Sequence, residues 1–185
     1  MAKTRAGGTR ALAAILPVLV LGAACAAHLR NAKSAYAEAQ WFARAYRTEA
    51  AIAAYKRARD EAALEARRRP SAQAFMLQGL AEVSLGLWRD AEQSLLRASG
   101  HGFEAGEAWA ADVSILGLAI SFEELGLGES AYRAYENLLG RSGFKPVRLA
   151  AAQRYFDLTL ALTLGLGDKE KGRALADLAK IVDRL

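Results

Sequence analysis

Small and large apolar residues return in this chain at a fixed interval of 40 residues. Ala51, Ala91 and Ala131 are spaced 40 apart, a large apolar residue follows each of them four positions later, and another apolar residue follows three positions beyond that. Spacings of three and four residues place side chains on one face of an α-helix. A face repeated at a constant period predicts similar helical units stacked in a row.

The rest of the chain beyond residue 30 shows the same helical spacing and no strand-like alternation of apolar and polar residues. Clusters of glycine, proline and polar residues divide it at Arg67–Ser71, Ser99–Gly106 and Gly140–Pro146. The sequence therefore predicts an all-α fold.

The turns inside the units differ in how clearly the sequence marks them. Gly86 and Gly126 stand where a helix is expected to end, because glycine readily adopts the left-handed conformation of a helix C-terminus. Residues 30–67 contain no glycine. They form either one long helix or two helices with a turn near Tyr46 and Thr48 as the N-cap of the second.

A small residue midway along the first helix of a unit precedes each glycine turn, at Gly79 in the second unit and Ala119 in the third. The first unit and a looser fourth unit carry the corresponding residues Ala39, Phe42, Ala51, Tyr55 and Ala58, and Leu158, Gly165, Ala174, Leu178 and Ile181. This pattern resembles the tetratricopeptide repeat. The resemblance spans about residues 32–184 and implies antiparallel helix pairs stacked as a short α-solenoid of about four pairs. The alternative is an ordinary helical bundle whose alanine-rich contacts imitate the repeat.

The same resemblance implies a concave groove lined by the first helix of each pair. The residues at the family's groove positions are Tyr36, Gln40, Met76, Leu80, Leu116, Ile120, Glu123, Tyr155 and Thr159. The middle of this surface is apolar, which favours an amphipathic helix or an extended peptide as the guest. The alternative is that these side chains close against one another in a compact bundle.

The amino terminus has the pattern of an export signal. Lys3, Arg5 and Arg10 precede an uncharged apolar run of 17 residues from Ala11 to Ala27. We expect residues 1–24 to be a signal peptide or membrane anchor, residues 25–31 a tether, and residues 32–185 the repeat domain. The run is short for a membrane span, although spans of about 17 residues occur.

Cys25 is the only cysteine, in Leu21-Gly22-Ala23-Ala24-Cys25. This segment resembles the lipobox of bacterial lipoproteins, with the leucine four residues before the cysteine rather than three. The resemblance implies a lipid-modified Cys25 facing the periplasm, and Ala26 after it implies the outer membrane. An uncleaved span and ordinary cleavage with soluble export are the alternatives.

The formal charge of +5 carries little information about nucleic acid. Three of the 25 basic residues and none of the 20 acidic ones precede Cys25, which leaves 22 against 20 in the remainder. One basic cluster stands out, Arg67-Arg68-Arg69, and its place before Pro70 favours charges that complement a helix C-terminus over a phosphate site. No nucleic-acid partner is expected.

Residues for catalysis or metal binding are not evident. His28 and His101 are isolated and are expected in solvent. Glu123 and Glu124 are adjacent, so on a helix they point about 100° apart and cannot share a proton. Nucleophile and phosphate-loop motifs are absent from the sequence. We therefore expect no enzyme, no metal and no cofactor.

The leading hypothesis is a membrane-tethered scaffold or adaptor of the cell envelope that binds another protein or peptide through the groove. A second is a periplasmic accessory protein of a transport system that holds a small ligand in an apolar cavity. A third, weaker hypothesis is an enzyme without a local signature. Self-association of the chain is open in each case.

Overall fold

The computed structural model describes residues 9–163, 172–173, 175–176 and 179–180, with side chains for residues 27–161 and for the last three of these ranges. The helices are α1 (Thr9–Arg44), α2 (Thr48–Arg68), α3 (Ala72–Ser84), α4 (Trp88–His101), α5 (Ala108–Glu124), α6 (Gly128–Arg141) and α7 (Lys145–Thr163), with the 3-10 turn η1 (Ala105–Glu107) before α5. No strand occurs among the described residues. The predicted all-α class is confirmed.

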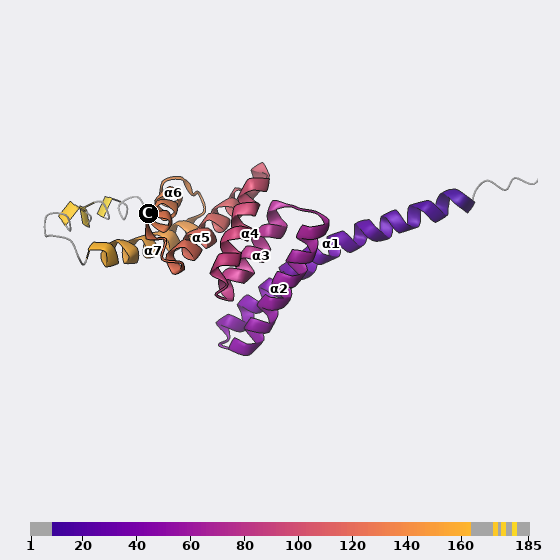
Figure 1. Ribbon diagram of the computed structural model, residues 1–185, viewed down its shortest axis with the longest axis horizontal. Helices are drawn as coiled ribbons and strands as arrows, with labels where there is room; N and C mark the ends of the chain where they lie inside the picture. Colours follow the sequence, from indigo (N-terminus) through magenta and orange to yellow (C-terminus); the bar gives the residue numbers. More distant parts are fainter. Residues whose placement is uncertain (1–8, 164–171, 174, 177–178, 181–185) are drawn as a thin grey trace, which may run out of the picture.

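The helices pack as successive pairs along an elongated molecule (Figure 1). Each second helix contacts its own partner and the first helix of the next pair: α2 lies between α1 and α3, α4 between α3 and α5, and α6 between α5 and α7. The first helices α1, α3, α5 and α7 also contact one another in succession. This arrangement is solenoid-like, as the 40-residue period predicts. In the expected fourth unit, Gly165 of the turn and Ala174, Leu178 and Ile181 of the second helix lie outside the described residues.

The three turns within pairs have one geometry, 40 residues apart. Tyr46, Gly86 and Gly126 occupy the left-handed region with φ of 56°, 72° and 75°. In each turn the next backbone N–H reaches back to a carbonyl five residues earlier, at 2.9 Å from Arg47 to Phe42, 2.9 Å from Leu87 to Glu82 and 2.8 Å from Leu127 to Phe122. These bonds satisfy carbonyls that the helix leaves without partners. Residues 30–67 therefore form two helices.

The predicted N-cap of α2 is wrong. Thr48 is the first helical residue, and Arg47 occupies the cap position without a side-chain hydrogen bond. Glu49 in the first turn still places a negative charge near the positive end of the helix dipole.

Glycines allow the helices to approach closely around Leu95, which is fully buried. A Cβ on Gly79 would lie 2.6 Å from Leu95 Cγ, and a Cβ on Gly117 would lie 3.0 Å from Leu95 Cδ1. Leu95 of α4 thus fills a slot between α3 and α5 that exists because both helices lack a side chain there. Ala51, Ala91 and Ala131 are also buried, as their spacing predicts.

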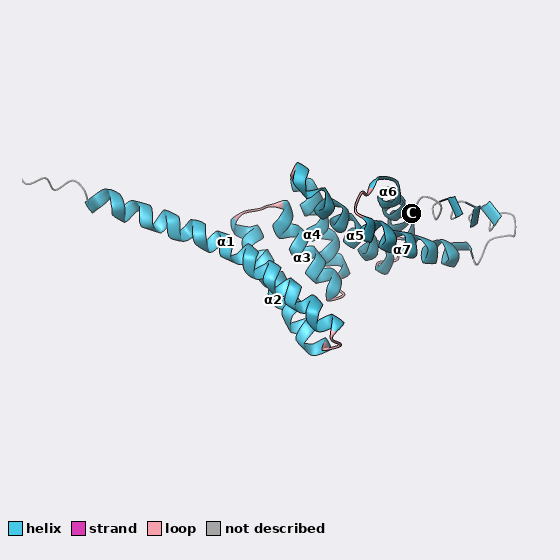
Figure 2. Ribbon diagram, turned by 180° about the vertical axis from the view of Figure 1, so that it is seen from behind, coloured by secondary structure: helices cyan, strands magenta, loops and turns pink. Residues whose placement is uncertain are grey.

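The expected tether at residues 25–31 is wrong, because these residues belong to α1. Leu29 packs against the core beside Phe75 and Met76, and Ala32 is fully buried. In Figure 2 a single helix runs from the projecting N-terminal part of the chain into the packed body. The apolar run therefore joins the folded domain through continuous helix rather than through a flexible link.

Candidate functional site

The expected groove is formed in part by α3 and α5, which lie next to each other. Leu80 on α3 and Leu116 and Ile120 on α5 are half-buried. Leu80 Cδ2 lies 3.1 Å from the position that a Cβ on Gly117 would take, so the two helices meet closely at this point. Leu80 packs partly against the core that contains Phe75, and Leu116 packs partly against the core that contains Tyr135. We call these three half-buried apolar residues of consecutive first helices the α3–α5 strip.

Three predicted groove residues are buried instead. Met76 belongs to the core beside Phe75, Tyr155 belongs to the core with Tyr135, and Thr159 donates a hydrogen bond of 2.7 Å to the carbonyl oxygen of Tyr155. They are 3–6% exposed. Assigning them to an open groove is wrong, because neighbouring helices cover these faces of α3 and α7.

Tyr36 and Gln40 lie on α1 at the edge of the same row of helices. Tyr36 is half-buried, with its ring 5.5 Å from the ring of Tyr55 in an edge-on contact. Burial raises the pKa of the Tyr36 hydroxyl, partly offset by hydrogen bonding to Ser84 and Gln40. Gln40 is exposed. Of these two, Gln40 is the more accessible to a partner.

Glu123 stabilises the packing of three helices. Tyr135 of α6 donates a hydrogen bond of 2.7 Å to Oε2 of Glu123, and Arg154 of α7 donates one of 3.3 Å to Oε1. Burial, together with the Glu123 carboxylate, raises the pKa of Tyr135 well above its usual range. Both carboxylate oxygens of Glu123 have partners within the protein. This geometry therefore does not support the prediction that Glu123 binds a partner polypeptide. Glu124 is exposed, so the two acids do not form a pair.

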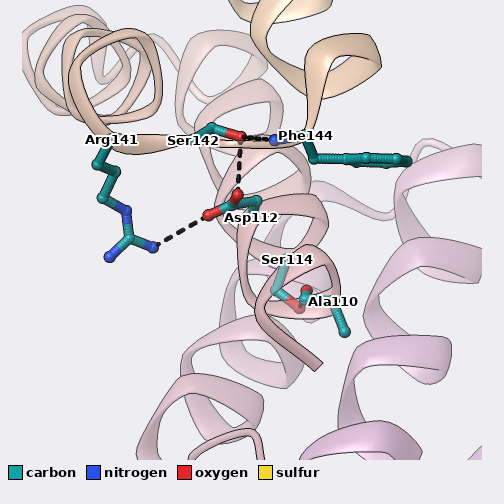
Figure 3. Close-up of polar contacts among 6 residues, drawn as sticks. All are labelled: Ala110, Asp112, Ser114, Arg141, Ser142 and Phe144. Carbon is teal, nitrogen blue, oxygen red and sulfur yellow. Dashed lines mark hydrogen bonds and ion pairs between the residues drawn. The ribbon is translucent and has the colours of Figure 1, made fainter. Parts of the chain in front are cut away.

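Asp112 holds the loop between α6 and α7 against α5 (Figure 3). It accepts a hydrogen bond of 2.7 Å from Ser142 and pairs with Arg141 at 3.4 Å. Ser142 in turn accepts from the backbone N–H of Phe144 at 3.2 Å. Every partner of Asp112 here is a neighbouring loop or helix residue, which indicates a structural role.

Three surface clefts of about 380, 340 and 310 Å³ lie along the first two helix pairs and the loop that follows them. Charged side chains line all three, including Glu38 and Arg57 in the largest, Glu82 in the second and Glu65 in the third. These clefts give no support to the expectation of an apolar ligand cavity.

Glu82 departs from the repeat. The positions 40 residues before and after it hold Phe42 and Phe122, yet Glu82 is only 3% exposed. Gln78 donates a hydrogen bond of 2.9 Å to its Oε1, while its Oε2 has no hydrogen-bond partner among the described residues. Burial raises the pKa of this carboxyl, partly offset by the hydrogen bond from Gln78. We therefore expect this buried acid, at a position otherwise occupied by phenylalanine, to weaken the core of the second pair.

His28 is half-buried and does not have the expected solvated environment, whereas His101 is exposed as expected. His28 Nδ1 lies 2.5 Å from Glu61 Oε2, and Arg68 donates to His28 Nε2 at 3.1 Å. Because an arginine can only donate, Nε2 must accept and the hydrogen lies on Nδ1. His101 is the last residue of α4 and stacks on the ring of Phe75 at 5.1 Å. No group of His, Cys, Asp or Glu within the described part of the chain could hold a metal ion.

Lipidation at Cys25 stays a prediction, since the side chain of Cys25 lies outside the described ones. One described segment, Ala105–Glu124, is long and apolar enough to cross a membrane by length and composition. It comprises η1 and α5, and α5 packs against α3, α4, α6 and α7. Core helices of soluble proteins share these properties, so this segment is weak evidence for a span.

No family model, curated protein or solved structure matches this chain.

Proposed function

We propose that this protein is a membrane-tethered scaffold of the cell envelope that binds a partner polypeptide on the α3–α5 strip. The observation that carries the proposal is the position of the strip. Leu80, Leu116 and Ile120 lie half-buried on two adjacent first helices of a solenoid-like stack. Stacked helix pairs commonly present an extended surface of this kind to a partner.

The chemistry of the strip indicates what it would bind. Leu116 and Ile120 are four residues apart and therefore lie on one face of α5. An amphipathic helix or extended peptide with apolar residues at matching spacing would remove the rest of their surface from water. Gln40 at the neighbouring edge of the row can supply a polar contact.

The tether rests on the apolar run at Ala11–Ala27. It continues directly into the packed part of α1, so attachment through a lipid on Cys25 or through an uncleaved span would hold the first helix pair close to the membrane. Intact mass spectrometry of the mature amino terminus distinguishes these cases. A lipid-modified Cys25 indicates a lipoprotein, an intact Met1 indicates a span, and an unmodified cleaved end would refute the tether.

Site-specific photo-crosslinking in cells tests the partner surface. A crosslinking amino acid at Leu116 or Ile120 should capture the same polypeptide, and one at Leu96, which is 49% exposed on α4, should not. The captured polypeptide should then bind the purified protein directly.

The matched variants are Leu116→Ser/Ile120→Ser and, as control, Leu96→Ser/Leu127→Ser. The first pair should abolish binding by the captured polypeptide while circular dichroism stays unchanged, and the control pair should bind normally. Equal capture from all three positions, or equal binding by both variants, would refute the assignment of this surface.

A further inference from the structure

The end of α2 brings guanidinium groups to the level at which α1 enters the folded body. Arg67, Arg68 and Arg69 are consecutive and exposed. Arg68 donates a hydrogen bond of 3.1 Å to His28, which directly follows the apolar run ending at Ala27. This contact joins residues 40 positions apart in the chain.

Helix pairing explains why these residues meet. α2 runs antiparallel to α1, so its C-terminus returns to the first turns of α1 that pack in the body. Arg69 and Ser71 line a cleft together with Leu29. The arginines and the loop after them therefore lie level with residues 28 and 29. Figure 1 shows α1 leaving the body there, with α7 at the opposite end of the molecule.

The cluster forms no ion pair with a described carboxylate. None of the ion pairs between described residues includes Arg67, Arg68 or Arg69. Two acids at this end already have partners or lie in the interior: Glu61 contacts His28 at 2.5 Å, and Glu65 is buried.

The carboxylates of the α4–α5 loop leave the balance positive. Glu107 accepts a hydrogen bond from Gln73. Glu104 is the exposed carboxylate that lines the same cleft as Arg69. Arg67 also lines a cleft with Asp60, Glu82 and Asp90, of which Asp60 pairs with Arg59 and Glu82 is buried. Glu104 and Asp90 are then the exposed carboxylates near the three exposed guanidinium groups, and neither forms an ion pair with them among the described residues. Arg67 and Arg68 lie in the last turn of α2, where their positive charge interacts favourably with the helix dipole. This interaction does not require a carboxylate partner.

We propose that Arg67, Arg68 and Arg69 bind the phosphate groups of anionic phospholipids in the bilayer that anchors the amino terminus. This inference rests on the proposed membrane tether and adds a second contact between the protein and the bilayer. With Ala11–Ala27 in the hydrocarbon region, His28 and the arginines beside it lie at the depth of the headgroups. Guanidinium matches phosphate oxygens in a two-point hydrogen-bonded geometry.

The same placement holds when a lipid on Cys25 is the anchor. Cys25 precedes His28 by three residues, a rise of about 4.5 Å along a helix. Each basic side chain near an anionic surface favours docking by about fivefold. The three arginines together fix the tilt of the first helix pair on the membrane, and the solenoid then extends outward toward α7.

A fluorescence experiment on the full chain in vesicles tests this contact. An environment-sensitive fluorescent amino acid is placed at Pro70, which is exposed and adjoins the cluster, or at Leu127 in the α5–α6 turn as a remote reference. The vesicles are phosphatidylcholine with or without phosphatidylglycerol. We expect a blue shift of the emission at position 70 only with phosphatidylglycerol, reversed by added salt, and no shift at position 127.

The variant Arg67→Gln/Arg68→Gln/Arg69→Gln should lose the shift. The control Arg44→Gln/Arg89→Gln/Arg133→Gln removes the same charge elsewhere and should keep it, and thermal unfolding checks that both variants fold. A shift that persists in the first variant, or that is equal in both kinds of vesicle, would overturn the inference. Co-flotation with vesicles separates the two proposals: a chain that floats without a shift refutes the lipid contact alone, and a chain that does not float refutes the tether as well.

Discussion

The second and third helix pairs share one backbone plan but fill their interiors differently. In the second pair, Leu95 of α4 packs in a slot bounded by Gly79 and Gly117. In the third, the equivalent of Leu95 is Tyr135, whose ring is buried and whose hydroxyl reaches Glu123. The period is therefore maintained by complementary side-chain volumes, and a polar contact can replace aliphatic packing where a hydrogen-bond partner is available.

The largest expected effect is at the slot of the second pair. Leu95→Ala should lower the free energy of unfolding by about 2–5 kcal/mol, because it leaves a cavity that glycine neighbours cannot fill. Urea denaturation measures the change. Leu96→Ala is the matched control, since Leu96 is exposed, and it should change stability by about 0.5 kcal/mol or less. Equal losses of stability in both variants would show that Leu95 is not tightly packed between α3 and α5.

Tyr135→Phe tests the polar counterpart in the third pair. Removing the hydroxyl leaves Glu123 with one internal partner, and hydrogen bonds to charged groups contribute about 1.5–3 kcal/mol. Tyr55 holds the same repeat position in the first pair and its hydroxyl has no hydrogen bond to another described residue. Tyr55→Phe should therefore leave the free energy of unfolding nearly unchanged. An equal loss of stability from Tyr55→Phe and Tyr135→Phe would show that the hydrogen bond to Glu123 does not stabilise the third pair.

The substitution Gly79→Ala tests how closely α3 approaches Leu95 of α4. The added methyl group would clash with Leu95, at an expected cost of about 1–3 kcal/mol for overpacking. Combining it with Leu95→Ala should cost less than the two single changes together, because the smaller side chain makes room. Strict additivity in a double-mutant cycle would show that the two residues do not compete for space.

Glu82 makes the second pair sensitive to pH. Its pKa is raised in the folded state, so the folded protein binds more protons than the unfolded chain between the ordinary and the raised pKa. Stability from this group is therefore lost as pH rises through that interval. Glu82→Gln should be more stable than the parent above the interval, by about 1 kcal/mol for relief of a buried unpaired oxygen, and close to it at acid pH.

Thermal unfolding across a pH series measures this effect. The control Glu124→Gln alters an exposed carboxyl on the same type of helix and should follow the parent at every pH. A Glu82→Gln variant that tracks the control would mean that water or a rearranged neighbour already satisfies Glu82.

The parts of this fold that the sequence predicts are those carried by residue type at fixed spacing. The period, the loops and the turns at Gly86 and Gly126 follow from glycine, proline and alanine positions. The tether was predicted wrongly because a polar segment after an apolar run suits a linker and an exposed helix equally well. Its packing depends on α2, and no local signal marks the contact between His28 and Arg68.

The groove residues show the same limit at the level of side chains. Spacing places Met76, Leu80, Leu116 and Thr159 on first helices, but the angle at which helices cross decides which of them is covered. Met76 and Thr159 are buried by that packing while Leu80 and Leu116 keep part of their surface. The partners of Glu123 likewise come from two other helices, so its structural role could not be predicted from spacing alone.

The smallest expected effect is at the turn that the sequence marks least clearly. Tyr46 holds the left-handed conformation that glycine holds at the equivalent positions 86 and 126, and it is 94% exposed, so its ring gains little packing in return. Tyr46→Gly should relieve about 1 kcal/mol of backbone strain, reduced by the greater freedom of glycine in the unfolded chain. We expect a small rise in Tm by calorimetry. Gly126→Ala, the reverse change at an equivalent turn, should lower Tm, and a Tyr46→Gly variant that also lowers it would show that the tyrosine stabilises the first pair through contacts of its side chain.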